Sequence, residues 1–191
     1  MSTTRPTLQT SRLVLRPPVE AYLPDIQRLV STWEIADTTL NIPHPYEDGM
    51  AEAWFKEQAE RYENGEGVHF CMFLQADETL MGGISFRLDA RHQRGELGYW
   101  ISVPFWGQGY CTETARAMVA YGFNTLDLNR IEAQHFTRNP ASGRVMQKIG
   151  MRYEGCLRQH VRRWDKFEDL AAYGILKQDF MESTSPLEPG P

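Results

Sequence analysis

Residues 104–113 read Pro-Phe-Trp-Gly-Gln-Gly-Tyr-Cys-Thr-Glu, and this stretch decides the fold. An apolar run over residues 97–103 precedes it, and a helical pattern over residues 110–126 follows it directly. A strand, a glycine-rich turn and a helix N-terminus in this order bind phosphate, because glycines let the backbone approach closely and free N–H groups face the anion. The stretch therefore predicts a phosphate compound at the start of the 110–126 helix.

Two common nucleotide-binding motifs do not fit this turn. A Walker A loop needs Gly-Lys-Ser/Thr, whereas Gly109 is followed by Tyr110 and Cys111. A dinucleotide-binding fingerprint needs a third glycine and the first strand of a βαβ unit, whereas Thr112 occupies that position in mid-chain. A purely structural role, in which the glycines only let the helix pack, stays open on the local sequence alone.

Composition bounds the class of protein. The chain has 191 residues, 41% of them hydrophobic, which suits one domain with a buried core. The formal net charge of -5 disfavours nucleic-acid binding, because nucleic-acid-binding proteins carry a basic face. No apolar run reaches the length of a membrane span and no signal peptide opens the chain, so we expect a cytoplasmic protein without a membrane partner.

The cysteine and histidine patterns predict neither a disulfide framework nor a metal site. Cys71, Cys111 and Cys156 are odd in number and far apart, with no CxxC pair among them. The five histidines show no HExxH motif and no close pairing. At residue 111, a thiol at a helix N-terminus suits a nucleophile, but a small apolar residue on the buried helical stripe is the favoured interpretation.

Hydrophobic periodicity predicts one α/β domain of the α+β type over residues 1–180. The helical patterns cover residues 20–31, 48–63, 110–126 and 140–149. The strand patterns cover residues 13–16, 68–75, 80–87, 96–103, 130–137, 152–162 and 169–176. This order predicts a mixed, mostly antiparallel seven-stranded sheet flanked by helices, with one parallel crossover around the glycine-rich turn.

Local signals predict where several of these elements begin and end. Asp48 is expected to cap the second helix, and Asn139 is expected to cap the fourth, with Pro140 at its first position. Gly150 suits the position after the end of that helix. The polar, proline-rich residues 181–191 predict a disordered tail.

Five short motifs occur in order between residues 8 and 178. They are Thr10-x-Arg12-Leu13-x-Leu15-Arg16, Glu96-Leu97-Gly98-Tyr99-Trp100, Trp106-Gly107-Gln108-Gly109-Tyr110-Cys111-Thr112-Glu113, Asn139-Pro140-Ala141-Ser142 and Ile149-Gly150-Met151-x-x-Glu154-Gly155. In this combination the chain resembles the GNAT superfamily of N-acetyltransferases, in particular the ribosomal-protein-alanine acetyltransferase branch (RimJ/RimL-like). Two residues depart from the superfamily pattern: Trp106 stands where Gln or Arg is usual, and Cys111 stands where Gly or Ala is usual.

The resemblance implies a single GNAT-like domain with splayed central strands, and acetyl-CoA as the co-substrate. The backbone of the turn would hold the CoA pyrophosphate, and the pantetheine arm would pair like an extra strand with the splayed strand. Gly98 suits either a bulge that starts the splay or a plain small residue in a strand. The implied cofactor-binding residues are Ile101, Val103, Trp106, Gly107, Gln108, Gly109, Tyr110, Cys111, Thr112, Asn139 and Ser142.

The resemblance also implies catalytic roles for Glu96 and Ser142. Acetyl transfer needs a neutral amine and a proton for the leaving thiolate. Glu96 would therefore be the base, directly or through water, and Ser142 would protonate the thiolate. Each has a structural alternative: Glu96 as a solvent-exposed charge at a strand end, and Ser142 as the third residue of a helix that Asn139 caps. Some relatives use another glutamate where this chain has Val161, which removes that base, and the adjacent His160 faces the other side of its strand.

The acceptor site is expected in the loop-like segment 32–47. Its Trp33, His44 and Tyr46 suit a cage for an ammonium group, although the same aromatic residues also suit a core. We expect direct attack in a ternary complex by a protein or peptide N-terminal α-amine. A small amine (a polyamine, an aminoglycoside or an amino acid) and a non-catalytic acyl-CoA-binding module are the alternatives, and the chain suits a monomer or a homodimer.

Overall fold

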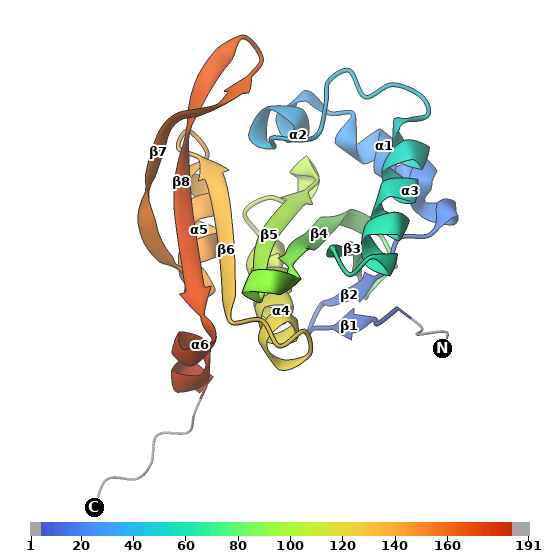
Figure 1. Cartoon of the computed structure of the whole chain (residues 1–191). Helices are drawn as coiled ribbons and strands as arrows, with labels where there is room; N and C mark the ends of the chain where they lie inside the picture. The colour runs from blue at the N-terminus through green and yellow to red at the C-terminus, as the bar shows by residue number, and fades with distance from the viewer. Residues whose placement is uncertain (1–4, 185–191) are drawn as a thin grey trace, which may run out of the picture.

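An eight-stranded sheet runs through the computed structural model, which describes residues 5–184 (Figure 1). The strand order is β1-β2-β3-β4-β5-β6-β8-β7, and every neighbouring pair is antiparallel except β5 and β6. The strands are β1 (Leu8–Gln9), β2 (Leu13–Arg16), β3 (Gly67–Leu74), β4 (Leu80–Asp89), β5 (Arg94–Ile101), β6 (Arg130–Phe136), β7 (Arg152–Arg163) and β8 (Lys166–Leu176). The strand that the sequence does not predict is β1, which is too short to show a period of two.

Helices cover both faces of this sheet (Figure 1). The α-helices are α1 (Leu23–Val30), α2 (Trp33–Thr38), α3 (Met50–Glu63), α4 (Tyr110–Asn124), α5 (Pro140–Lys148) and α6 (Lys177–Thr184). One core lies between the sheet and α4, where Ala115, Met118 and Val119 are buried against strand residues such as Phe70. A second core lies on the other face under α1 and α3, around Ile26.

The central strands β5 and β6 separate soon after they meet. They pair only over Arg94–Glu96 and Arg130–Glu132, although β5 continues to Ile101 and β6 to Phe136. Figure 1 shows the two strands diverging toward α2. The predicted splay is therefore confirmed. It does not start from a bulge at Gly98, because the register of β4 and β5 runs without a shift through the pair of Gly98 and Ser85.

Three local expectations differ from the structure. The segment 32–47 contains the short helix α2, and Gly49 rather than Asp48 precedes α3, with a φ of 87° that suits glycine. The Asp48 carboxylate instead accepts a hydrogen bond from Gln27 Nε2 at 2.8 Å. Helix α6 continues over the first residues of the predicted tail, and residues 185–191 lie outside the described residues. Within residues 5–184, no helix combines the length and the apolar character needed to cross a membrane.

Candidate active site

A cleft of about 450 Å³ opens beside the C-terminal end of β5. Its walls come from α2, β5, the loop before α4, the first turn of α4, and α5. The lining residues are Ile35, Thr38, Thr39, Tyr99, Trp100, Ile101, Phe105, Trp106, Gly107, Gly109, Tyr110, Cys111, Thr112, Asn139, Ala141, Ser142, Arg144, Val145 and Lys148. The structure thus brings most of the predicted cofactor-binding residues together around one hollow.

The glycine-rich turn presents free backbone donors to this cleft. Gly107 and Gly109 have φ angles of 75° and 82°, a left-handed conformation that glycine adopts without a steric penalty. The backbone N–H groups of residues 107–112 make no hydrogen bond to any group within residues 5–184. Such a run of unpaired N–H groups at the start of a fifteen-residue helix can bind an anion, and the helix dipole adds to the attraction.

Trp106 fixes the turn to the end of β5. Its indole Nε1 donates a hydrogen bond to the Ile101 carbonyl oxygen at 2.6 Å. Gln or Arg, which the superfamily pattern favours here, would offer a flexible side chain, whereas the indole is rigid and spans from the loop to the strand. The departure at residue 106 therefore has a structural account in this chain.

Two hydroxyl groups meet at the wall of the cleft. Tyr99 Oη lies 2.9 Å from Ser142 Oγ and 3.0 Å from the Ser142 carbonyl oxygen, so β5 and α5 are joined at this point. Burial raises the pKa of Tyr99, although its hydrogen bond with Ser142 opposes this, and the phenol stays protonated at neutral pH. Tyr99 is a site residue that the sequence analysis missed; its place in the Glu96–Trp100 motif was the available signal.

Asn139 and Ser142 also keep the structural relation that the sequence predicts. The Asn139 side chain accepts a hydrogen bond from the Ser142 N–H at 3.4 Å, Pro140 begins α5, and Gly150 follows the helix with a φ of 91°. The cap uses the backbone of Ser142 only. Its hydroxyl is therefore left for Tyr99 and for a ligand.

Cys111 lines the cleft as a neutral thiol. Burial raises the pKa of Cys111 to about 12, which opposes any lowering by the helix N-terminus. The Cys111 thiol is therefore protonated at neutral pH. This supports the interpretation of Cys111 as a small residue that fits the turn, rather than as a nucleophile.

Several predicted residues lie outside the lining of the cleft. Val103 belongs to the short 3₁₀ turn Val103–Phe105 after β5 rather than to the strand. Gln108 does not line the cleft, and its side chain donates a hydrogen bond to the Pro104 carbonyl oxygen at 2.8 Å. Glu96 lies on the paired part of β5, where its carboxylate is 3.4 Å from Arg87 Nη1 and partly exposed.

The predicted acceptor residues divide between two places. Trp33 and His44 pack edge to face at 5.3 Å, and Trp164 from the β7–β8 hairpin lies 5.0 Å from Trp33. Tyr46 is half-buried against the core under α1 and α3. Val161 lies in β7 opposite Glu168, and the adjacent His160 is exposed. Neither residue lines the cleft.

Helix α2, which forms the outer wall of the cleft, is attached to the β7–β8 hairpin. Arg138 joins the carboxylates of Asp37 and Glu168, each at 2.9 Å. Arg163 donates to the carbonyl oxygens of Ala36 and Ile42. These contacts hold Thr38 and its neighbours over the splayed strands, beside the site formed by Tyr99 and Ser142.

The charged residues that line the cleft are all cationic. Arg144 and Lys148 are its charged lining residues, and none of the lining residues within 5–184 carries a carboxylate. A polycationic ligand would therefore find no counter-charge in the lining. A ligand that carries phosphate groups would find both the free amides of the turn and two cations.

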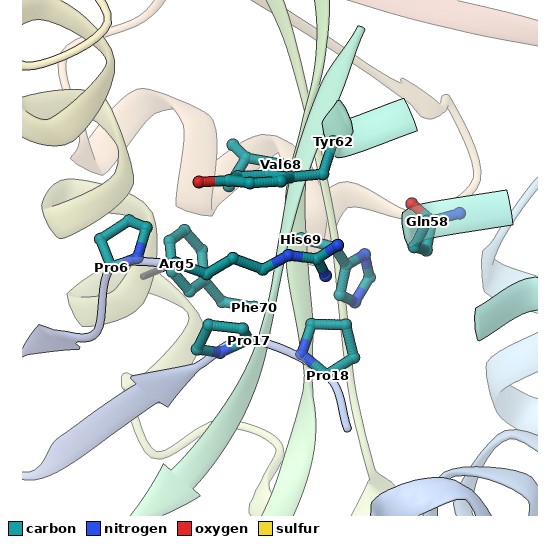
Figure 2. Close-up of a pocket in the computed structure, with 9 residues that line it drawn as sticks. All are labelled: Arg5, Pro6, Pro17, Pro18, Gln58, Tyr62, Val68, His69 and Phe70. Carbon is teal, nitrogen blue, oxygen red and sulfur yellow. The ribbon is translucent and has the colours of Figure 1, made fainter. Parts of the chain in front are cut away.

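A second, much smaller cavity lies beside β3, between α3 and the residues that follow β2. Figure 2 shows Arg5 between the Tyr62 ring and two prolines, Pro17 and Pro18. The cavity measures about 10 Å³, which is room for one water molecule. Burial lowers the pKa of the neighbouring His69 to about 4, so this imidazole is neutral at pH 7. The 450 Å³ cleft is therefore the candidate site for a larger ligand.

Comparisons with known proteins agree with this geometry. The family model described as acetyltransferase (GNAT) domain matches residues 12–152. YoaA, an uncharacterized N-acetyltransferase of Bacillus subtilis (strain 168), is 31% identical over 173 residues, which cover 90% of this chain and 97% of YoaA. The ribosomal-protein-serine acetyltransferase of Escherichia coli (strain K12) is 28% identical over 113 residues, which cover 59% of this chain and 62% of that enzyme.

A solved structure shows the same fold. RimL, a ribosomal L7/L12 alpha-N-protein acetyltransferase in complex with coenzyme A, superposes with a TM-score of 0.82 at 20% identity, over 90% of this chain and 98% of that one. At this identity the likeness supports the fold. The overall fold of this chain is thus that of a solved acetyltransferase.

Proposed function

This chain belongs to the GNAT acetyltransferase family, and we propose that within it the chain acetylates the N-terminal α-amine of a protein or peptide. It is an acyltransferase whose acetyl donor is acetyl-CoA. The observation that carries the proposal is the cleft at the end of β5, which joins free amides, two hydroxyls and two cations without a carboxylate. A relative that acts on ribosomal proteins adds support for a protein acceptor.

The donor side of the proposal uses the loop and the splayed strands. The amides of residues 107–112 would bind the diphosphate of CoA, with Arg144 and Lys148 on the neighbouring wall as further partners for phosphate. The pantetheine arm would follow β5 past Ile101, where β6 has already separated. The thioester would then lie near Ser142, whose hydroxyl would protonate the leaving thiolate.

The acceptor side follows from the absence of a carboxylate in the lining. An α-amine has a pKa of about 7.7–8.0, so about one third of it is neutral at pH 7.5, against about 0.1% of a lysine-like amine. A site that places no base in contact with the amine suits the α-amine, which attacks the thioester directly in the ternary complex. Glu96 stays our prediction for the group that receives the released proton, through water, because its side chain does not line the cleft.

A panel of acceptors tests this proposal. We expect peptides with a free α-amine to gain one acetyl group from acetyl-CoA, measured by mass spectrometry, and their rate to rise with pH through about 7.7–8.0 as the amine loses its proton. The same peptides with a blocked N-terminus but a free lysine are the matched control and should stay unmodified. Faster acetylation of spermidine or of an aminoglycoside would favour the small-amine alternative. CoA binding without turnover on any amine would favour the non-catalytic module.

A further inference from the structure

One carboxylate ties the turn between β1 and β2 to the first turn of α4. Glu113 Oε1 accepts hydrogen bonds from Thr10 Oγ1 at 2.7 Å, from Ser11 Oγ at 2.9 Å and from the Arg12 N–H at 2.9 Å. Its other oxygen, Oε2, accepts from Arg12 Nε at 2.7 Å. These donors belong to the Thr10-x-Arg12 motif, which lies outside the cleft and has no part in the site described so far.

The guanidinium of Arg12 continues from this carboxylate to the glycine-rich turn. Arg12 Nη1 donates to the Gln108 carbonyl oxygen at 3.2 Å, and the guanidinium carbon lies 4.2 Å from the centre of the Tyr110 ring. A Cβ placed on Gly109 would lie 3.6 Å from Arg12 Nη2. One side chain therefore contacts Gln108 and Tyr110, on either side of Gly109, in the loop that offers its amides to the cleft.

The charge of Glu113 needs this partner. A carboxylate in the first turn of α4 places a negative charge close to the amides that would receive a diphosphate. Burial on its own raises the pKa of Glu113, but the hydrogen bonds from Thr10, Arg12 and Ser11 outweigh it and lower the pKa to about 2. The carboxylate is thus charged at every pH at which the enzyme would work, and Arg12 supplies the opposite charge.

We propose that Arg12, held in place by Glu113, is a positioning residue for the acetyl donor. It fixes the backbone of residues 108–110 and cancels the negative charge at the start of α4, so that the free amides stay favourable for a diphosphate. This inference rests on the proposed function, because it assigns the diphosphate of CoA to this loop. Arg12 acts through the loop and not on the reacting atoms.

Calorimetric titration of the full chain with CoA and with pantetheine, which lacks the nucleotide and the diphosphate, tests this role. We expect Arg12→Gln to raise the dissociation constant of CoA about tenfold, because a charge-assisted contact to the loop is lost. The affinity for pantetheine should stay at the wild-type value. Equal losses for both ligands, or no loss for CoA, would overturn the proposal.

Arg16→Gln is the matched control. Arg16 also pairs with a carboxylate, Glu78, at 2.7 Å and also stacks on an aromatic ring, that of Phe73 at 5.2 Å, but neither partner belongs to the loop. Its loss should leave CoA affinity unchanged. A fall in CoA affinity as large as that of Arg12→Gln would mean that any surface ion pair matters equally, and the proposal would fail.

The double variant Arg12→Gln/Glu113→Gln separates the charge from the shape of the loop. It should bind CoA more tightly than Arg12→Gln alone, because no unpaired carboxylate then remains in the first turn of α4, close to the amides of the loop. Binding as weak as that of the single variant would contradict the charge argument. Two results must be kept apart. If the wild-type chain binds no CoA, the proposed function itself fails. If the wild-type chain binds CoA and Arg12→Gln binds it equally well, only the role of Arg12 fails.

Discussion

Replacing Ser142 with alanine is expected to lower kcat for acetyl transfer by about 100-fold, the lower end of the range for the loss of a general acid. Ser142 Oγ lies 2.9 Å from Tyr99 Oη at the wall of the cleft, and both hydroxyls are protonated at neutral pH. Ser142→Ala removes the hydroxyl proposed to protonate the leaving thiolate, and Tyr99, its neighbour in the lining, is held by the Ser142 carbonyl oxygen. Thiol release with a peptide acceptor measures kcat, and KM for acetyl-CoA should change little, since the diphosphate loop is untouched.

The same variant separates the catalytic role of Ser142 from its structural one. The helix cap uses the Ser142 N–H, which alanine retains, so the melting temperature should stay at the wild-type value. Ser31→Ala is the control, because it removes a part-buried hydroxyl that donates to the Gln27 carbonyl oxygen away from the cleft. A Ser142→Ala variant with full kcat, or one that loses activity only because it melts early, would speak against the proton-donor role.

Replacing Gly82 with alanine is expected to destabilise the protein by about 3 kcal/mol, because the new methyl group has no space. Its Cβ would lie 2.3 Å from the Trp100 carbonyl oxygen and 2.9 Å from the Ile101 Cα, both of which are backbone atoms of β5. Relief requires β4 and β5 to move apart at the end that carries the cleft. For a chain of this size we expect the melting temperature to fall by about 6–12 °C.

Gly98→Ala is the matched control on β5. The nearest atom to its Cβ would be Ser85 Oγ at 3.6 Å, an ordinary contact, and the register there is regular. Its stability should stay within about 0.5 kcal/mol of the wild type. Similar melting temperatures for Gly82→Ala and the wild type would show that β4 and β5 are not held in the register described here.

The local parts of the site could be predicted from the sequence. The glycine-rich turn, the helix after it and the Asn139 cap each depend on residues next to one another, so short motifs suffice to place them. The segment 32–47 shows the limit of this approach. Its six-residue helix α2 is too short for a clear helical period, and it is held by Arg138 and Arg163 from distant parts of the chain.

The contacts that join the site could not be predicted in the same way. Tyr99 and Ser142 are 43 residues apart, and Arg12 and Glu113 are 101 residues apart. Each pair meets only because the sheet brings separate strands and helices together, and no local pattern carries that information. Glu96 illustrates the same limit. Its motif predicts a catalytic base, but the motif does not show that Glu96 lies where β5 is still paired with β6, outside the lining of the cleft.

Titration of the 191-residue chain with CoA, followed by thermal unfolding, tests the central claim most directly, because it needs no knowledge of the acceptor. We predict binding at one site and, at a CoA concentration 100 times the dissociation constant, a stabilisation of about 2.7 kcal/mol. The melting temperature should then rise by about 5–10 °C. No heat of binding and an unchanged melting temperature at millimolar CoA would contradict the assignment of the loop at residues 107–112 to the acetyl donor.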